Sequence, residues 1–186
     1  LTFGRLITGL AYALGVAALV AGRVDLAKAE STQALALKPD WAQGAILRAQ
    51  VLKKDAPGDV IPYYQAFVSR YPDSRELRLQ LARELASGRR NAEARQEFRA
   101  VEPLAAADPQ IPYAIGLLSL QLEDWADAEV AFRRALAKGH PDPGAVHLGL
   151  GQAAESASRY DEALDWYRKV DAGDWMRAQM RIAALI

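Results

Sequence analysis

Apolar and small side chains recur along this chain at a long, nearly constant spacing. One position is aromatic in four of its five occurrences, and successive occurrences lie 33, 34, 34 and 35 residues apart: Ser31, Tyr64, Phe98, Phe132 and Tyr167. Three residues further on, a second set keeps the same spacing: Ala34, Phe67, Val101, Ala135 and Val170. Because residues three apart share a face of an α-helix, the pattern predicts one buried helix face in every internal repeat.

The period is typical of a known family. A helix–turn–helix unit of about 34 residues resembles the tetratricopeptide repeat. The resemblance implies an all-α fold, a right-handed superhelical array of about 11 helices in which 1–186 is a single solenoid. We expect full repeats at about 8–41, 42–74, 75–108, 109–143 and 144–177, and a partial repeat at 178–186.

The resemblance also assigns roles to small residues. The family needs a small side chain where the two helices of a unit touch, and this position holds Gly15, Ala49, Ala82, Gly116 and Gly151. The residues before four of them are expected in the core: Leu14, Leu81, Ile115 and Leu150. Gly22 and Gly88 are expected in the turns between paired helices. Prolines lie between the units, where a helix must end: Pro39, Pro72 and Pro109.

The first stretch of the chain has a competing interpretation. Residues 6–22 carry no charge and lie between Arg5 and Arg23. A membrane span needs about 20 mostly apolar residues, and a signal peptide has a shorter apolar core with a small-residue cleavage site. The repeat pattern includes this stretch in register, so we favour a buried helix of the first unit. Because the chain starts at Leu1 and ends inside a helical pattern, we expect it to be a piece of a longer protein.

Composition narrows the classes of function. The 186 residues include 37 alanines, and alanine is the strongest helix former, in agreement with an all-helical fold. Lys and Arg together number 23, as do Asp and Glu, so the formal net charge is zero. This balance argues against binding to nucleic acid, which needs a basic excess. The absence of cysteine excludes disulfides, thiolate metal sites and cysteine nucleophiles.

The family resemblance implies a binding groove. Arrays of this kind have a concave wall lined mainly by first helices, and the corresponding positions here are Tyr12, Val16, Gln43, Gln50, Leu79, Arg83, Tyr113, Leu117, Gln121 and Gln152. The set mixes apolar side chains and amides with few charges, which favours a peptide held by apolar contacts and amide hydrogen bonds. Tyr12 and Tyr113 are the best anchors, since tyrosine gives a large contact area at a small entropy cost. Packing on a preceding repeat is the alternative for Tyr12 and Val16.

Catalytic and metal chemistry have little support in the sequence. The only histidines are His140, in a loop between units, and His147, on the following helix. Together with Asp142 they lack the helical spacing of a zinc site, and no glycine-rich phosphate loop or HExxH motif occurs. We therefore predict a protein that is not an enzyme and holds no metal or cofactor. Arginines on the second helices, such as Arg90, Arg95 and Arg133, are expected to be solvated and paired with neighbouring acids.

A narrower resemblance concerns location. Residues 22–29 (GRVDLAKA), 34–39 (ALALKP), 113–118 (YAIGLL) and 160–170 (YDEALDWYRKV) are similar to tetratricopeptide lipoproteins of the proteobacterial outer membrane. Some members of that group are adaptors that bring cell-wall hydrolases to a carboxyl-terminal processing protease. The resemblance implies a periplasmic scaffold, and without it a cytoplasmic location is expected.

Three functions are compatible with these patterns. The first is a non-catalytic scaffold or adaptor that binds a peptide or partner protein in the groove. The alternative is a docking or regulatory segment of a larger enzyme, such as a glycosyltransferase. The third is self-association, since an uncapped array exposes apolar ends. We expect a protein or peptide partner, no nucleic acid, and no direct membrane insertion by this stretch.

Overall fold

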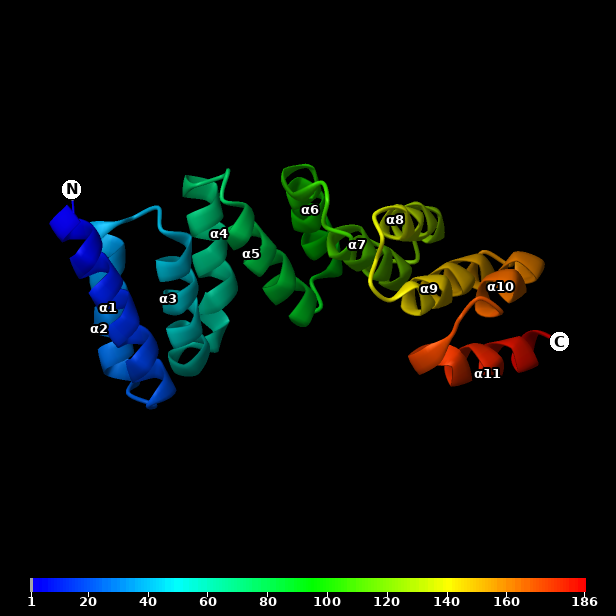
Figure 1. The fold of residues 1–186 in the computed structure, drawn as a ribbon, viewed down its shortest axis with the longest axis horizontal. Helices are drawn as coiled ribbons and strands as arrows, with labels where there is room; N and C mark the ends of the chain where they lie inside the picture. Colours follow the sequence, from blue (N-terminus) through cyan, green and yellow to red (C-terminus); the bar gives the residue numbers. More distant parts are fainter. Residues whose placement is uncertain (1) are drawn as a thin grey trace. The chain divides into compact units, whose positions relative to one another are not determined.

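The computed structural model describes residues 2–186, apart from the side chains of residues 2, 3, 5 and 172. Every regular element in this range is helical (Figure 1), which confirms the predicted all-α fold. The α-helices are α1 Thr2–Val20, α2 Val24–Leu37, α3 Ala42–Asp55, α4 Val60–Arg70, α5 Arg75–Ser87, α6 Asn91–Val101, α7 Gln110–Gln121, α8 Trp125–Ala137, α9 Pro143–Ser156, α10 Tyr160–Tyr167 and α11 Trp175–Leu185. Three short 3-10 turns accompany them: η1 Pro57–Asp59, η2 Glu102–Ala105 and η3 Ala172–Asp174.

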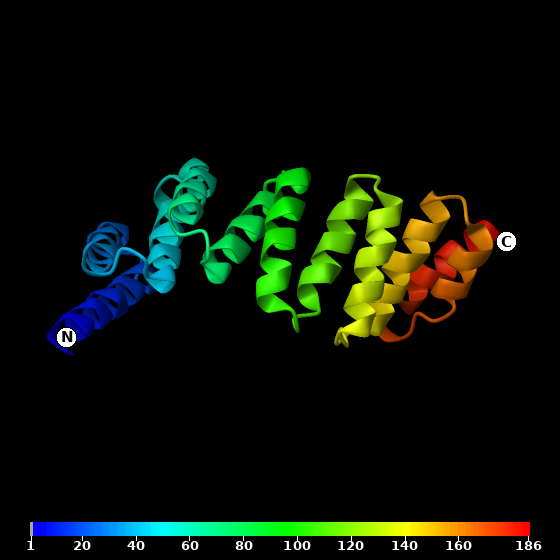
Figure 2. The same cartoon turned by 90° about the horizontal axis from the view of Figure 1, so that it is seen from above.

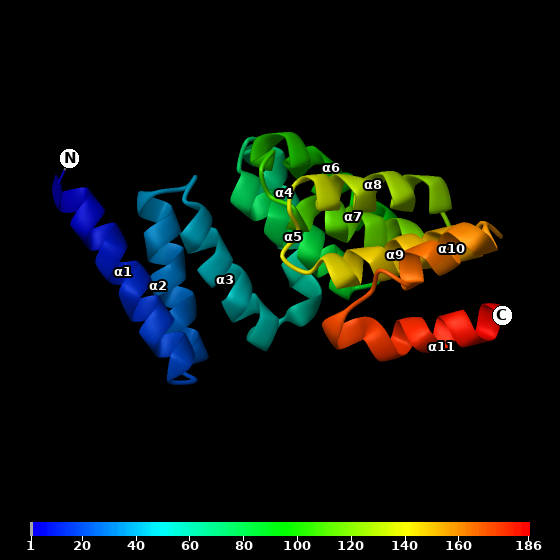
Figure 3. The same cartoon turned by 45° about the vertical axis from the view of Figure 1, so that its right-hand side comes forward.

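The helices form two compact units, Leu1–Glu84 and Leu85–Ile186, with the boundary inside α5. We call them unit 1 and unit 2 and describe each by itself. In unit 1, α1 packs along α2 and also contacts α3. In unit 2, α7 packs on α8, α8 on α9 and α9 on α10, and α11 contacts α10 (Figures 2 and 3). From α1 to α4 and from α6 to α11, consecutive helices are therefore neighbours in space, as helix–turn–helix units require.

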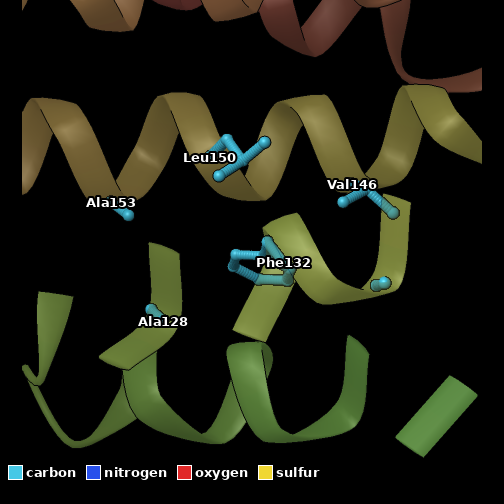
Figure 4. Packing of buried hydrophobic residues seen from close by; sticks show 6 residues of the cluster. Ala128, Phe132, Val146, Leu150 and Ala153 are labelled. Atoms are coloured by element: carbon cyan, nitrogen blue, oxygen red, sulfur yellow. The ribbon is translucent and has the colours of Figure 1, made fainter. Parts of the chain in front are cut away.

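The predicted core positions on the second helices are buried, with one exception: the prediction for Phe67 is wrong, because its ring is only half-buried. Exposure is 6 % or less at each residue of the aromatic position: Ser31, Tyr64, Phe98, Phe132 and Tyr167. Figure 4 shows Phe132 between α8 and the side chains of Val146, Leu150 and Ala153 on α9. Ser31, which replaces the aromatic ring in α2, donates a hydrogen bond from its Oγ to the Lys28 carbonyl oxygen at 3.0 Å.

The prediction for Leu14 is wrong. Leu81, Ile115 and Leu150 are almost fully buried, whereas Leu14 is 45 % exposed. The difference follows from the neighbours. Helices α7 and α9 each contact the helix before them as well as the helix after them. Among the described residues, α1 contacts only helices that follow it, and it does so through a stripe of small side chains that includes Ala11, Gly15 and Ala18.

Helix α1 is a packed repeat helix. A Cβ atom on Gly15 would lie 2.8 Å from Leu47 of α3 and 3.3 Å from Glu30 of α2, so the close approach of these helices depends on glycine. Ala18 belongs to a small buried cluster with Ala27 and Val51. Within residues 2–186, no helix has the combination of length and apolarity that a membrane crossing needs.

The turns between paired helices repeat one backbone feature. A residue with a positive φ lies in the turn after α1, α5, α7 and α9: Gly22 (73°), Arg89 (58°), Glu123 (59°) and Ser158 (60°). Gly88 lies in its turn as predicted, but the left-handed conformation falls on the next residue, Arg89. Non-glycine residues in this region carry strain, and within residues 2–186 the turn geometry imposes it at Arg89, Glu123 and Ser158.

Candidate partner-binding surfaces

Unit 1 contains a cleft between three helices. Its volume is ≈ 240 Å³, and it is lined by Ile46, Ala49, Gln50 and Lys53 of α3, Val60 and Tyr64 of α4, and Gln80 and Glu84 of α5. The α3 residues lie at i, i+3, i+4 and i+7, so they form a single helical face. This spacing explains why one side of α3 presents both apolar and amide groups to the cleft. We call this site the α3–α5 cleft.

Polar contacts link α3 and α5, one across the α3–α5 cleft and one beside it. Lys53 Nζ lies 2.5 Å from Glu84 Oε1, and Gln43 Nε2 donates to Glu76 Oε2 at 3.1 Å. Burial raises the pKa of Tyr64 above its ordinary range, and the nearby Glu84 adds to the effect, so the phenol stays protonated at neutral pH. The cleft thus offers apolar wall, amide groups and an ion pair, which suits an apolar or amide side chain of a protein ligand.

The residues predicted for the groove on α1, α3 and α5 have different surroundings in unit 1. Gln50 lines the α3–α5 cleft, and Gln43 forms the hydrogen bond to Glu76. Leu79 is half-buried and Arg83 is exposed. On α1, Val16 is 36 % exposed, and the Tyr12 ring packs on Trp41 with a centroid distance of 4.9 Å. Tyr12 therefore already has an aromatic partner within the unit.

The remaining predicted residues belong to α7 and α9 of unit 2. Leu117 is 38 % exposed, Gln121 is exposed and Gln152 is half-buried. Tyr113 packs on Phe132 and His140, with centroid distances of 5.8 and 4.5 Å. Burial raises the pKa of Tyr113, and nearby acids add to the rise. The ten predicted residues are thus divided between the two units, and their joint groove stays a prediction.

Sequence reasoning missed the α5 side of the α3–α5 cleft. Gln80 and Glu84 line it, whereas the predicted positions on α5 were Leu79 and Arg83. A pair of opposite charges separated by about one repeat could have indicated these residues from the sequence. Lys53 and Glu84 are opposite charges 31 residues apart, close to one period, which brings them to neighbouring positions on successive first helices.

The two histidines have separate structural roles. His140 Nδ1 lies 2.9 Å from the Asp142 carbonyl oxygen, and its Nε2 lies 3.2 Å from Gln110 Oε1. His147 stacks on Trp166 with a centroid distance of 5.7 Å. In the part of the chain that the structure describes, no three His, Asp or Glu side chains converge on a possible metal position.

Several arginines on or next to the second helices are paired with acids, as predicted, but Arg95 is half-buried rather than solvated, and Arg90 precedes α6. Arg90 contacts Glu93 at 2.6 Å, Arg133 contacts Glu129 at 2.8 Å, and Arg95 contacts Asp124 at 2.8 Å. Hydrogen bonds from Arg159 and Arg133 lower the pKa of Glu129 although burial opposes the shift. The positive charge of these arginines is therefore largely neutralised by acids of the same molecule.

Comparison with known proteins supports the repeat assignment. Residues 113–175 match the family model described as tetratricopeptide repeat. A crystal structure of MamA has 18 % sequence identity and a TM-score of 0.75, and the match covers 93 % of this chain and 94 % of that one. PilF of Pseudomonas aeruginosa has 20 % identity and a TM-score of 0.66, with 89 % and 75 % covered.

A third solved structure, MamA from Desulfovibrio magneticus RS-1, has 15 % identity and a TM-score of 0.72, with 94 % and 96 % of the two chains covered. Among curated proteins, no sequence matches this chain. At these identities the likeness concerns the fold. The resemblance to outer-membrane lipoproteins is not addressed by these matches and stays a prediction.

Proposed function

We propose that this chain is a tetratricopeptide-repeat protein and that it acts as a non-catalytic interaction scaffold whose partner binds the first-helix face. By first-helix face we mean the ten predicted positions on α1, α3, α5, α7 and α9, together with the α3–α5 cleft. The partner is a protein or peptide segment with apolar and amide-bearing side chains.

The α3–α5 cleft carries this proposal. Gln50 was assigned to a binding wall from its repeat position, and it lines a cleft of ≈ 240 Å³. A cavity of this size accommodates a side chain rather than a whole cofactor, since typical small-molecule sites are about 300–1,000 Å³. The Gln50 and Gln80 amides supply donors and acceptors that fix the direction of a bound backbone.

Exposed apolar surface on α7 supports the same face in unit 2. Most of α7 is apolar, and Ile111, Ile115 and Leu118 are buried, but Leu117 remains 38 % exposed. Gln121, one helical turn further on, is also exposed. An exposed leucine next to an amide matches the mixed contact surface expected for peptide binding.

Site-specific photo-cross-linking tests the proposal in cells. The photo-reactive amino acid p-benzoylphenylalanine is introduced at Gln50 or Gln121 of the full-length protein, and at Gln96 as a matched control. Gln96 is an exposed glutamine on the second helix α6. We expect one protein to cross-link at both first-helix positions and not at Gln96. Equal cross-linking at Gln96, or no adduct at Gln50 and Gln121, would contradict the proposal.

A further inference from the structure

Unit 1 has a second cleft, between the second helices α2 and α4. Its volume is ≈ 310 Å³, and its lining includes Leu35 and Pro39 from the α2 side and Tyr63, Phe67 and Tyr71 from the α4 side. None of these residues lines the α3–α5 cleft. The proposed first-helix face therefore leaves this α2–α4 cleft without a role.

An aromatic stripe forms one wall of the α2–α4 cleft. Tyr63, Phe67 and Tyr71 follow one another at i, i+4 spacing, with ring-centroid distances of 6.1 and 4.9 Å. All three side chains are only partly buried. The repeat pattern assigns Tyr64 and Phe67 to the core face of α4, and Tyr64 is buried there whereas Phe67 is only half-buried. Tyr63 and Tyr71 lie outside the periodic core positions, and partly exposed aromatic side chains of this kind dominate the energetics of protein interfaces.

Two buried polar atoms lie next to this stripe without partners. Among the described protein groups, neither Arg48 Nη1 nor Tyr63 Oη has a hydrogen-bond partner. Burial raises the pKa of Tyr63 to about 12, and the charge of Arg48 acts in the opposite direction, so the two groups lie within electrostatic reach. A buried donor without an acceptor is unfavourable, and a single oxygen could accept from both groups. The positive charge of Arg48 favours an anionic oxygen in that role.

Unpaired positive charge near the cleft also favours an anionic ligand group. Arg70 lines the cleft, and its Cζ lies 5.7 Å from the centroid of the Tyr71 ring. No ion pair involves Arg48 or Arg70 within residues 2–186, whereas Arg95, Arg134 and Arg181 are each paired with an acid. The cleft therefore combines an apolar aromatic wall with one lining cation, Arg70, while Arg48 lies outside the lining but within electrostatic reach of Tyr63. Neither cation has a counter-charge in the described structure.

We propose that the α2–α4 cleft is a second docking site, which binds a protein segment carrying an apolar side chain next to a carboxylate. The apolar side chain packs on Tyr63, Phe67 and Tyr71. Movement of the Tyr63 side chain, which lines the cleft, opens a path by which the carboxylate accepts hydrogen bonds from Tyr63 Oη and Arg48 Nη1. Arg70 contributes at the solvent-exposed edge. This site is independent of the first-helix face.

Two matched peptides test this site. The ¹⁵N-labelled full chain is titrated with acetyl-Leu-Asp-Leu-amide and with acetyl-Leu-Asn-Leu-amide, and amide shifts are followed by NMR. We expect the aspartate peptide to bind at least tenfold more tightly and to shift amides of α4 and of residues 35–39. Arg48→Gln and Arg70→Gln should each remove the preference for aspartate. Arg75→Gln, an equal charge change outside the cleft, should preserve it.

The proposal is wrong if the two peptides bind with equal affinity or if neither binds. It is also wrong if the NMR shifts are confined to α3 and α5, or if Arg70→Gln keeps the preference for the aspartate peptide. Because Arg70 is exposed, that variant keeps the test valid if Arg48→Gln fails to fold. Shifts confined to α3 and α5 would assign the peptide to the first-helix face, so the outcomes of the two proposals are distinguishable.

Discussion

At the scale of single residues, three helical glycines of unit 2, Gly116, Gly149 and Gly151, are explained by the two buried rings that they face. A Cβ atom on Gly116 would lie 2.7 Å from the Phe132 ring, and one on Gly149 would lie 2.5 Å from it. A Cβ atom on Gly151 would overlap the Tyr167 ring in the same way. In these contacts, a large ring on the second helix occupies the space that a side chain on the first helix would need. The small position on the first helix and the aromatic position on the second helix therefore contact each other within the repeat.

Gly116→Ala should destabilise the protein by about 1–3 kcal/mol, because the added methyl group overlaps Phe132 in a filled core. The matched control is Gly9→Ala. Gly9 is also helical, but a Cβ there meets no atom within 4 Å, so alanine should stabilise by about 0.5–1 kcal/mol through helix propensity. Urea denaturation measures both. Equal effects of the two substitutions would show that contact with Phe132 does not decide the outcome.

The left-handed turn residues lead to a prediction with the opposite sign. Glu123 has a φ of 59° and is exposed. Glu123→Gly should therefore raise the free energy of unfolding by about 1 kcal/mol, because glycine adopts this conformation without steric strain. Gly139→Ala is the converse control, since Gly139 has a φ of 72° and open space around it. It should lower stability, and thermal melts compare the two. A lower melting temperature for Glu123→Gly would contradict this explanation.

At the scale of elements, a polar network joins α6, α7 and α8. Arg95 of α6 contacts Asp124 at 2.8 Å and Asp127 at 3.2 Å, and Arg99 contacts Asp127 at 2.5 Å. The buried hydroxyl of Ser119 on α7 donates to Asp127. Burial alone would raise the pKa of Asp127, but the hydrogen bonds from Ser119 and Arg99 outweigh it and lower that pKa. The folded state therefore favours the ionised carboxylate.

This shift predicts a pH dependence. A carboxyl whose pKa is lowered by folding contributes stability above its unfolded pKa, about 3.9 for aspartate, and that contribution is lost as pH falls through the folded value. Asp127→Asn should cost about 1–3 kcal/mol at pH 7. Its stability should then fall less than that of the wild type between pH 7 and pH 3, as measured by urea unfolding. Parallel losses in both proteins would contradict this role for Asp127.

The helical pattern was predictable because it depends on spacing along one chain. The aromatic and small positions recur with the period, and burial follows from them in α4, α6, α8 and α10. Leu14 was misplaced because its burial depends on a neighbouring helix, which periodicity does not supply. The left-handed conformation at Arg89 was missed because Gly88, the residue suited to it, is adjacent.

At the scale of the whole molecule, the candidate sites were only partly predictable. Repeat position placed Gln50 at a cleft, but it also selected Tyr12 and Tyr113, whose rings pack on Trp41, Phe132 and His140. The α2–α4 cleft was missed because its two orphaned polar groups come from different helices, and only folding brings Arg48 near Tyr63. Both clefts lie within unit 1, while Leu117 marks the proposed face in unit 2.

The most direct test of the scaffold proposal uses the partner captured by cross-linking. Isothermal titration calorimetry compares Leu117→Asp with Val130→Asp. Both replace an exposed apolar residue of unit 2, 38 % exposed on the first helix α7 and 52 % exposed on the second helix α8. The account predicts that Leu117→Asp weakens binding at least tenfold and that Val130→Asp leaves it unchanged. Unchanged affinity in Leu117→Asp, or an equal loss in both variants, would contradict binding at the first-helix face.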